Sequence, residues 1–353
     1  MIENVFDIVI KRRNARAMPA HERATIGDVA AEAGVSIATV SRVVNRRYGV
    51  APGTTSRVQA VIADLGYESS LVARSLRSRK TNVIGIIVAD IEPFSAELLK
   101  GVARAINGSG YEQIVYSGGG HAEDQVGWER RYLSRLSGTL TDGIILVTPT
   151  VVEVPAGGPV VAVDPHAGSS TLPTVDSHNL QGAIAATEYL RSLGHRRIGF
   201  LAGRPDLESA RLREEGYRHA LAQTGIGFDP ALVRVGGYSL ATAAGPAREL
   251  LELVDRPTAI FAANDLSAIA TMQEARSLGL RIPDDVSIIG FDNIPESALT
   301  DPPLTTIDQS IQTMGFEAAK LLVRLIDEPD SDPVHLTLPT ELVIRQSCRT
   351  FSG

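Results

Sequence analysis

The sequence predicts an α/β protein in which a small three-helix domain precedes a large domain of two lobes, each a doubly wound parallel sheet. Three observations support this fold class. Residues 24–68 contain short helical patterns separated by turn residues, β-rich runs alternate with amphipathic helices from Thr81 onward, and this alternation occurs twice. Alternating strands and helices are typical of parallel sheets, because each return to a parallel strand needs a crossover.

Composition narrows the class of protein. The chain has 353 residues, of which 44% are hydrophobic, enough for two or three domains with real cores. Its single cysteine, Cys348, excludes a disulfide framework or a thiolate metal site within one chain and fits a reducing compartment. No apolar run is long enough to cross a bilayer, and basic residues 11–13 follow the first apolar residues, the reverse of a secretory signal. We expect a cytoplasmic protein with no membrane partner, metal or cofactor, and a disordered arm at residues 1–23.

The charge is divided unequally along the chain. Residues 1–80 carry 13 Lys and Arg against 7 Asp and Glu, a net +6, whereas the remainder carries 21 against 34, a net −13. A basic small domain joined to an acidic large one indicates that the small domain meets a polyanion, for which duplex DNA is the main candidate. A chance excess of arginine near one terminus is the alternative.

The small domain, residues 24–68, shows two helix starts and a turn. Thr25 opens a capping box with the acidic residue three positions later, and Gly34 supplies the turn after the first helix. Ser36 can cap a second helix over residues 37–45, and a third helix spans residues 54–65. The apolar positions of all three helices recur at i, i+3 and i+4, so that they can share one small core.

Helix, glycine-containing turn, helix is the geometry that places a second helix in the major groove of DNA. The N-terminal part of the second helix would then face the base edges. Arg42 could donate two hydrogen bonds to a guanine, whereas apolar side chains there could contact a thymine methyl group. The predicted base-reading residues are Ile37, Ala38, Ser41 and Arg42. An ordinary three-helix bundle with a solvated face is the alternative.

Two stretches carry a family resemblance. "TIGDVAAEAGVSIATVSRVVN", followed by "VAPGTTSRVQAVIADLGYESSLVARSLRS", resembles the DNA-binding module of the LacI/GalR family of bacterial transcription regulators, and the likeness continues over nearly all of residues 24–347. The resemblance implies a double-stranded operator as partner. It also implies contacts to DNA phosphates from Thr25, Ser36, Thr39 and Asn45. Such contacts fix the register of the protein on DNA but carry no sequence information.

The segment over residues 69–80 is similar to the hinge helix of that family, which orders on the operator in the minor groove. The leucine matching Leu76 wedges between base steps in the family, and unstacking is offset by added contact surface. Two hinges meeting at one step imply a homodimer on a roughly palindromic site. The predicted minor-groove residues are Val72, Ala73, Leu76 and Arg77. A leucine that only packs against its partner hinge is the alternative.

The large domain, residues 81–353, alternates runs and helices in two halves. The first half has β-rich runs at 82–90, 111–117 and 142–147 with helices from about 95 and 123; the second has runs at 195–203, 257–265 and 285–292 with helices from about 209 and 266. Two such halves resemble the periplasmic sugar-binding protein fold. We expect the first lobe at about 81–176 plus 308–333 and the second at about 177–307 plus 334–353.

Carboxylates follow several predicted strands, where ligands of open α/β sheets bind. They are Asp90, Asp164, Asp176, Asp265 and Asp292. Carboxylates accept hydrogen bonds from hydroxyl groups, so a cluster around a cleft suits a polyhydroxylated ligand. A strand-end aspartate that caps the next helix is the alternative, and we expect it for Asp90 and Asp292.

Similarity to the family selects the ligand-binding residues. By this resemblance they are Phe94, Ser95, Asp164, Asp176, Ser209, Arg213, Tyr238, Asn264 and Asp265. The stretch "DIEPFS" is one residue shorter than the family's usual loop, and Leu207 stands where the purine-responsive member has an arginine, which disfavours a purine corepressor. The expected function is a repressor released from its operator by a sugar-like effector; a regulator that needs a corepressor is the alternative.

Two other classes of protein compete with a regulator. An enzyme of doubly wound fold is one, but the sequence contains no GxGxxG after a strand, GxxxxGK[ST], HExxH or GxSxG motif. A free-standing sugar-binding protein is the other, and residues 24–78 count against it because such a carrier has no use for them. We therefore expect no enzymatic activity.

Overall fold

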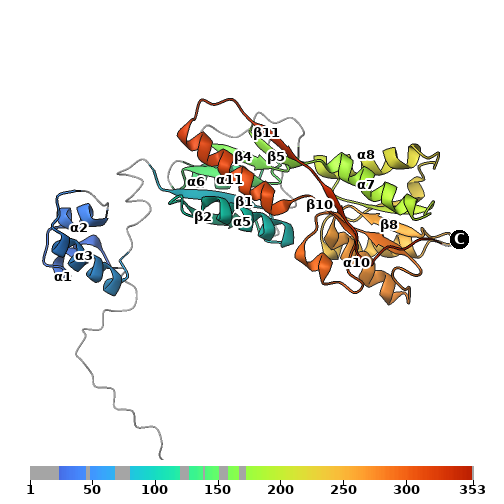
Figure 1. Ribbon diagram of the computed structural model, residues 1–353, viewed down its shortest axis with the longest axis horizontal. Helices are drawn as coiled ribbons and strands as arrows, with labels where there is room; N and C mark the ends of the chain where they lie inside the picture. The colour runs from blue at the N-terminus through green and yellow to red at the C-terminus, as the bar shows by residue number, and fades with distance from the viewer. Residues whose placement is uncertain are drawn as a thin grey trace, which may run out of the picture. The chain divides into compact units, whose positions relative to one another are not determined.

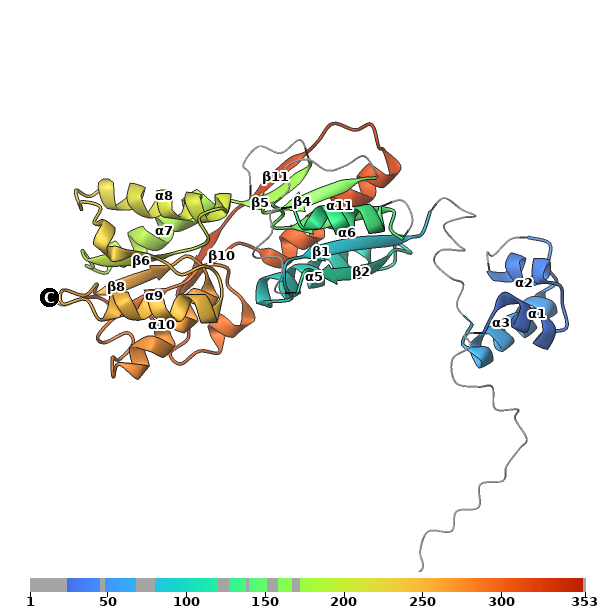
Figure 2. The same cartoon turned by 180° about the vertical axis from the view of Figure 1, so that it is seen from behind.

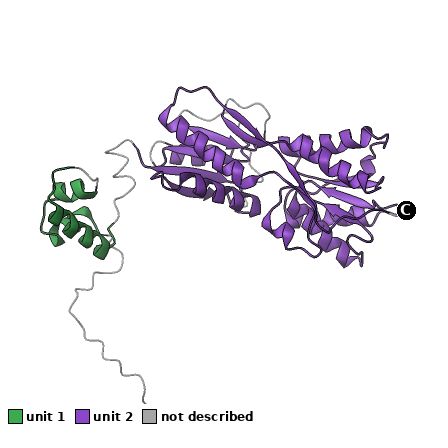
Figure 3. Ribbon diagram, viewed as in Figure 1, with its two compact units in different colours: residues 1–77 green, residues 78–353 purple. Residues whose placement is uncertain are grey.

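The computed structural model describes residues 24–44, 48–67, 80–119, 127–137, 140–150, 158–166 and 172–351. The chain divides into two compact units, residues 1–77 and residues 78–353, which Figure 3 colours separately. The predicted arm at residues 1–23 and all of the predicted hinge segment except Lys80 lie outside the described residues.

The first unit contains three helices, α1 (Ile26–Glu32), α2 (Ile37–Val44) and α3 (Pro52–Leu65). Val29, Val40 and Val58, one from each helix, are fully buried and pack into one small core. The turns at Gly34 and Gly66 have φ values of 62° and 59°, in the left-handed region that glycine adopts without a Cβ clash. The three helices that the sequence predicts are therefore present, with α3 beginning two residues earlier than expected.

The second unit has two lobes, drawn in Figures 1 and 2. The first lobe is a parallel six-stranded sheet in the order β11-β5-β4-β3-β1-β2. Its strands are β1 (Val83–Val88), β2 (Glu112–Ser117), β3 (Gly143–Val147), β4 (Val160–Val163), β5 (Thr174–Ser177) and β11 (His335–Leu338). All residues of β1, β3 and β4 are buried, as expected for a parallel sheet covered on both faces.

Helices α5 (Pro93–Ile106) and α11 (Ile311–Asp327) cover one face of this sheet, and α6 (Glu129–Leu136) packs against the other. The backbones of α5 and α11 approach closely at two glycines. A Cβ at Gly101 would overlap the carbonyl of Gln312, and a Cβ at Gly315 would overlap the carbonyl of Leu98. Only glycine at both positions allows this crossing.

The second lobe is a parallel four-stranded sheet in the order β7-β6-β8-β9. Its strands are β6 (Ile198–Ala202), β7 (Val233–Val235), β8 (Ala259–Ala262) and β9 (Ser287–Ile289). Helices α7 (Asn179–Ser192) and α8 (Glu208–Ala222) lie on one face, and α9 (Leu240–Leu251) and α10 (Asp265–Ser277) on the other, as Figure 2 shows. Two hydrophobic clusters fill the space between the sheet and these two helix layers.

The chain passes between the lobes near residues 178, 309 and 340. Strands β10 (Thr306–Asp308) and β12 (Glu341–Val343) form an antiparallel pair beside the second sheet. The expected lobe boundary is wrong at one point. The sequence predicts all of residues 334–353 in the second lobe, but β11 pairs with β5 at the edge of the first sheet, so the chain returns to the second lobe only after Leu338.

Candidate functional sites

The first candidate site is the outer face of helix α2. The Ser36 hydroxyl accepts a hydrogen bond from the Thr39 N–H (3.2 Å) and caps this helix. Val40 and Val43 turn inward, whereas Ile37 is 54% exposed. The buried valines of α2 therefore determine which face of the helix is exposed to solvent.

The predicted base-reading residues lie on that outside face. Ala38 and Arg42 are exposed and Ser41 is half-buried. Thr25 accepts from the Asp28 N–H at 3.3 Å and donates its own N–H to the Asp28 carboxylate at 2.7 Å, so the predicted capping box is present. The contacts of these residues with DNA stay predictions. Asn45 and the hinge residues Val72, Ala73, Leu76 and Arg77 lie outside the described residues.

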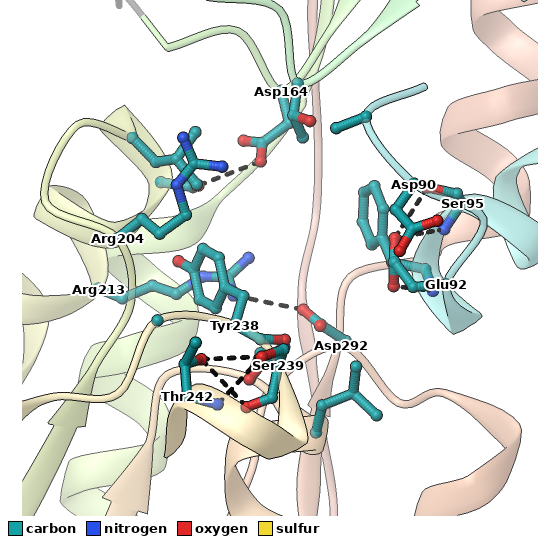
Figure 4. Close-up of a pocket in the computed structure, with 18 of the residues that line it drawn as sticks. Asp90, Glu92, Ser95, Asp164, Arg204, Arg213, Tyr238, Ser239, Thr242 and Asp292 are labelled. Atoms are coloured by element: carbon teal, nitrogen blue, oxygen red, sulfur yellow. Dashed lines mark hydrogen bonds and ion pairs between the residues drawn. The ribbon is translucent and has the colours of Figure 1, made fainter. Parts of the chain in front are cut away.

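The second candidate site is a cavity of about 420 Å³ between the two lobes of the second unit. This volume falls within the range of roughly 300–1,000 Å³ that small-molecule sites occupy. Residues of both lobes line it, as Figure 4 shows. Seven of the nine predicted ligand-binding residues are on its wall: Phe94, Ser95, Asp164, Ser209, Arg213, Tyr238 and Asn264.

Arg213 is the most extensively bonded side chain of the wall. It is buried on α8, and its Nε donates to Asn179 (2.8 Å) while Nη1 donates to the Ala263 carbonyl (2.6 Å). Nη1 also reaches the Asp292 carboxylate at 3.3 Å, and the guanidinium lies 3.8 Å from the centre of the Phe291 ring. These contacts from several elements hold the guanidinium in one position.

Asp292 belongs to the cavity, which corrects the expectation that it caps a helix. It follows β9 with φ 116°, and Oδ1 accepts from Arg213 and from Gln309 Nε2 (2.6 Å). Burial raises the pKa of this carboxyl, and the Arg213 charge opposes that rise. Asp90 also lines the cavity instead of capping α5, because Glu92 occupies the N-cap position.

Asp265, predicted to bind the ligand, lies inside the second lobe. It is fully buried, Oδ2 accepts from the Ile294 N–H (2.9 Å), and Oδ1 accepts from the Thr306 hydroxyl (2.5 Å). Burial raises its pKa to about 7. The carboxylate thus ties α10 to the segment after β9 and to the first residue of β10. Its neighbour Asn264 reaches the cavity instead.

Asp164 connects the two lobes. It follows β4 with φ 49°, and its Oδ2 accepts from the Ser209 hydroxyl at 3.1 Å, across the cavity between the lobes. Burial raises the pKa of Asp164. Asp176, the other predicted carboxylate of this lobe, is not on the cavity wall. Burial, and next the charge of Asp164, raise the pKa of Asp176 to about 6.

The first lobe contributes the loop between β1 and α5. Glu92 accepts from the Phe94 N–H (2.8 Å) and the Ser95 N–H (2.9 Å), which caps α5 and fixes the loop. Burial raises the pKa of this carboxyl. Phe94 and Asp90 complete the wall on this side. The shortened "DIEPFS" loop therefore still faces the cavity.

Sequence reasoning missed several cavity residues besides Asp292. They include Glu92, Arg204, Ser239, Thr242 and Gln309. Arg204 comes two residues after β6, so the strand-end rule that found the carboxylates would also have found it. Gln309 comes directly after β10, which is too short a strand for its pattern to be recognised.

The Tyr238 ring also depends on a glycine. A Cβ at position 203 would overlap the tyrosine ring, so Gly203 leaves the space in which this ring lies against the second lobe. The Arg213 guanidinium lies 5.8 Å from the ring centre on the cavity side. Tyr238 thus lies on the cavity wall, and its stacking on a bound molecule stays a prediction.

No group of His, Cys, Asp and Glu in the described residues could hold a metal ion. No helix in the described part of the chain has the length and apolar character needed to cross a membrane.

Comparison with protein families gives two matches. Residues 25–70 match the family "Bacterial regulatory proteins, lacI family", and residues 187–348 match "Periplasmic binding protein-like domain". The first match covers the helix α2 site and the second covers most of the second lobe.

Two relatives match over nearly the whole chain. The HTH-type transcriptional regulator CelR of Thermobifida fusca is 34% identical over 345 residues, covering 94% of this chain and all of that protein. The HTH-type transcriptional repressor PurR of Photobacterium profundum is 34% identical over 337 residues, covering 93% and 100%.

Two solved structures have the same fold. A transcriptional regulator CelR–cellobiose complex has 32% identity and a TM-score of 0.68, covering 92% of this chain and all of that one. A lac repressor dimer bound to operator and an anti-inducer has 27% identity and a TM-score of 0.76, covering 93% and 100%.

Proposed function

Since the chain belongs to the LacI family of bacterial regulatory proteins, we propose that it is a repressor whose binding to operator DNA is controlled by a sugar held between the lobes of residues 78–353. Like its named relatives, the chain is a DNA-binding transcription regulator and not an enzyme. The nature of the effector and the direction of the response are the proposed parts.

The observation that carries the proposal is the cavity wall itself. It contains carboxylates from both lobes, Asp90 and Asp164 from the first and Asp292 from the second, beside the aromatic side chains Phe94 and Tyr238. Carboxylates accept from hydroxyl groups, and aromatic faces suit the apolar faces of sugar rings. The solved relative that holds cellobiose supports the same class of ligand.

A ligand in this cavity would touch both lobes at once. The Ser209–Asp164 hydrogen bond and the approach of His166 Nδ1 to Asp206 Oδ2 (3.2 Å) already join the lobes. A sugar that fits one angle between the lobes better than another shifts the population toward that angle. The effect on operator binding equals the effect of the operator on sugar binding, because the coupling is reciprocal.

The DNA-binding part of the proposal follows the family. The homodimer reads a roughly palindromic operator with Ile37, Ala38, Ser41 and Arg42 at base edges and Thr25, Ser36, Thr39 and Asn45 at phosphates. The hinge residues, with Leu76 as the wedge, lie in the minor groove. The solved dimer on its operator supports this mode of binding. The regulator works in the cytoplasm, where its operator lies.

A ligand panel tests the proposal. Pentoses, hexoses, disaccharides, polyols and nucleosides are scored by the melting temperature of the full chain and by release from operator DNA. We expect at least one sugar to raise the melting temperature and to weaken operator binding. A ligand that raises the melting temperature but strengthens operator binding would make the protein a corepressor-dependent regulator. A response to nucleosides alone would contradict the sugar effector.

A further inference from the structure

Three aspartates on the cavity wall have carboxylate oxygens that can still accept hydrogen bonds from a ligand. Asp90 Oδ1 accepts from the neighbouring Ile91 N–H (2.8 Å), and its Oδ2 accepts from no residue that the structure describes. Asp292 makes both of its contacts through Oδ1, and Asp164 uses Oδ2 alone. One oxygen of each of these three aspartates is therefore left for a ligand, and a carboxylate oxygen needs a ligand that donates.

The two arginines of the wall are already paired with carboxylates. Arg204 makes two hydrogen bonds to Asp206, Nε to Oδ1 at 3.2 Å and Nη2 to Oδ2 at 2.7 Å. Arg213 is paired with Asp292 and held by Asn179 and the Ala263 carbonyl. Their positive charge is balanced within the protein, so that neither offers an unmatched cation to an anionic ligand.

Helix N-termini are the other common anion sites, and three of those at this cavity, the starts of α5, α9 and α10, already have a side-chain acceptor as cap. Glu92 caps α5, the Ser239 hydroxyl accepts from Thr242 N–H at the start of α9, and Asn264 Oδ1 accepts from Ser267 N–H at the start of α10. The first turn of α8 carries Glu208, and its Ser209 donates to Asp164. At α5, α9 and α10, protein acceptors therefore take the place that a phosphate would need. At α8, which has no side-chain cap, Glu208 instead places a negative charge in the first turn.

We propose that the cavity accepts an uncharged, hydroxyl-rich sugar and rejects the phosphorylated form of the same sugar, and that Asp90 is a residue that sets this preference. The proposal rests on the proposed function and narrows its ligand class. A phosphate group carries about −1.5 to −2 charge at pH 7 and has only acceptor oxygens to present. Placed near Asp90, it meets like charge, and the Asp90 carboxylate has no proton to donate to it.

Asp90 is the carboxylate to test because replacing it disturbs the fewest hydrogen bonds within the protein. Its side chain is exposed to the cavity and contacts only the adjacent backbone N–H among the described residues, whereas Glu92 caps a helix and Asp292 is paired. Asp90→Asn keeps the size of the side chain, removes its charge and adds a donor. Asp332→Asn is the matched control, because Asp332 is exposed in the segment between α11 and β11.

The experiment is titration calorimetry of the full chain with matched pairs: cellobiose and cellobiose 6-phosphate, glucose and glucose 6-phosphate, ribose and ribose 5-phosphate. We expect the neutral member of any pair that binds to bind at least about tenfold more tightly. Asp90→Asn should reduce that ratio several-fold, mainly by improving the phosphorylated member, and Asp332→Asn should leave it unchanged. Retained operator binding confirms that each variant is folded.

Three results would overturn the proposal in different ways. A phosphorylated sugar that binds as tightly as its neutral partner contradicts the preference and leaves the sugar effector standing. An unchanged ratio in Asp90→Asn contradicts the role of Asp90. If neither member of any pair binds and no sugar of the ligand panel binds either, the sugar effector of the proposed function fails and the preference fails with it.

Discussion

At the scale of single residues, the orientation of the side chain decides which strand-end aspartate reaches the cavity. The strand-end rule places both Asp265 and Asp292 at the correct edge of the sheet, but it does not say where each carboxylate points. The left-handed backbone of Asp292 (φ 116°) aims it at Arg213, whereas Thr306 and the Ile294 N–H hold Asp265 inside the lobe. Those partners are distant in sequence, so the pattern of one strand could not reveal them.

Replacing Asp292 tests this assignment. Asp292→Asn keeps the shape of the side chain but removes the charge that a ligand hydroxyl and Arg213 share, which costs about 1.5–3 kcal/mol for a hydrogen bond to a charged group. We expect effector affinity to fall at least about tenfold in calorimetry. Asp265→Asn should instead lower the free energy of unfolding and change effector affinity much less. The reverse pattern would restore Asp265 as the ligand-binding residue.

The burial of Asp176 should make the stability of the protein depend on pH. Its pKa is raised from 3.8 to about 6 in the folded protein, so folding takes up a proton between these pH values. Stability from this group is present at low pH and is lost as the pH rises through about 6. Asp176→Asn should therefore melt higher than the wild type at pH 7.5, with the difference shrinking toward pH 4. A difference that does not vary with pH would contradict the raised pKa.

We expect Arg42 to contribute to the sequence specificity of operator binding, and not only to its affinity. Arg42 is exposed on the outer face of α2, the face that carries the predicted base-reading residues. Arg42→Ala should lose about 1–3 kcal/mol of discrimination at one base pair of the operator. Binding to a set of single-base operator variants measures this loss. An equal loss on every sequence would make Arg42 a phosphate contact.

At the scale of elements, the helices of the first unit were predictable because their caps are local. The capping box at Thr25 and the glycines after α1 and α3 act within a few residues, and the structure has all of them. Strand β11 was not predictable as part of the first lobe, since its place at the sheet edge depends on pairing with β5, 161 residues earlier for His335 and Thr174. The assignment of β11 to the first lobe therefore depended on contacts between distant residues, which the local sequence pattern does not reveal.

The crossing of α5 and α11 makes an element-scale prediction. An added methyl group at Gly315 would overlap the Leu98 carbonyl, and the backbone there cannot move aside without disturbing both helices. Gly315→Ala should lower the free energy of unfolding by about 1–3 kcal/mol in chemical denaturation. Gly227→Ala is the control, because a Cβ there meets nothing within 4 Å. A Gly315→Ala variant as stable as the control would show that the crossing can relax.

At the scale of the whole molecule, the alternation of strands and helices was enough to predict two doubly wound lobes after a three-helix unit. It could not predict the cavity, because its wall combines residues from Ala89 to Gln309 that only the crossovers near 178, 309 and 340 bring together. Gln309 illustrates this: it lies on a crossover and contacts Ser177, Arg213 and Asp292. The cavity is therefore positioned where a ligand can act on both lobes.

The most direct test of sugar control through this cavity is fluorescence anisotropy of a labelled operator, selected by the protein from random duplexes. Wild type and Asp292→Asn are titrated with the sugar that raises the melting temperature of the wild type. We predict that both bind the operator equally well without sugar, that sugar releases the wild type, and that the variant needs at least about tenfold more sugar for release. Release of both proteins at the same sugar concentration would contradict the account.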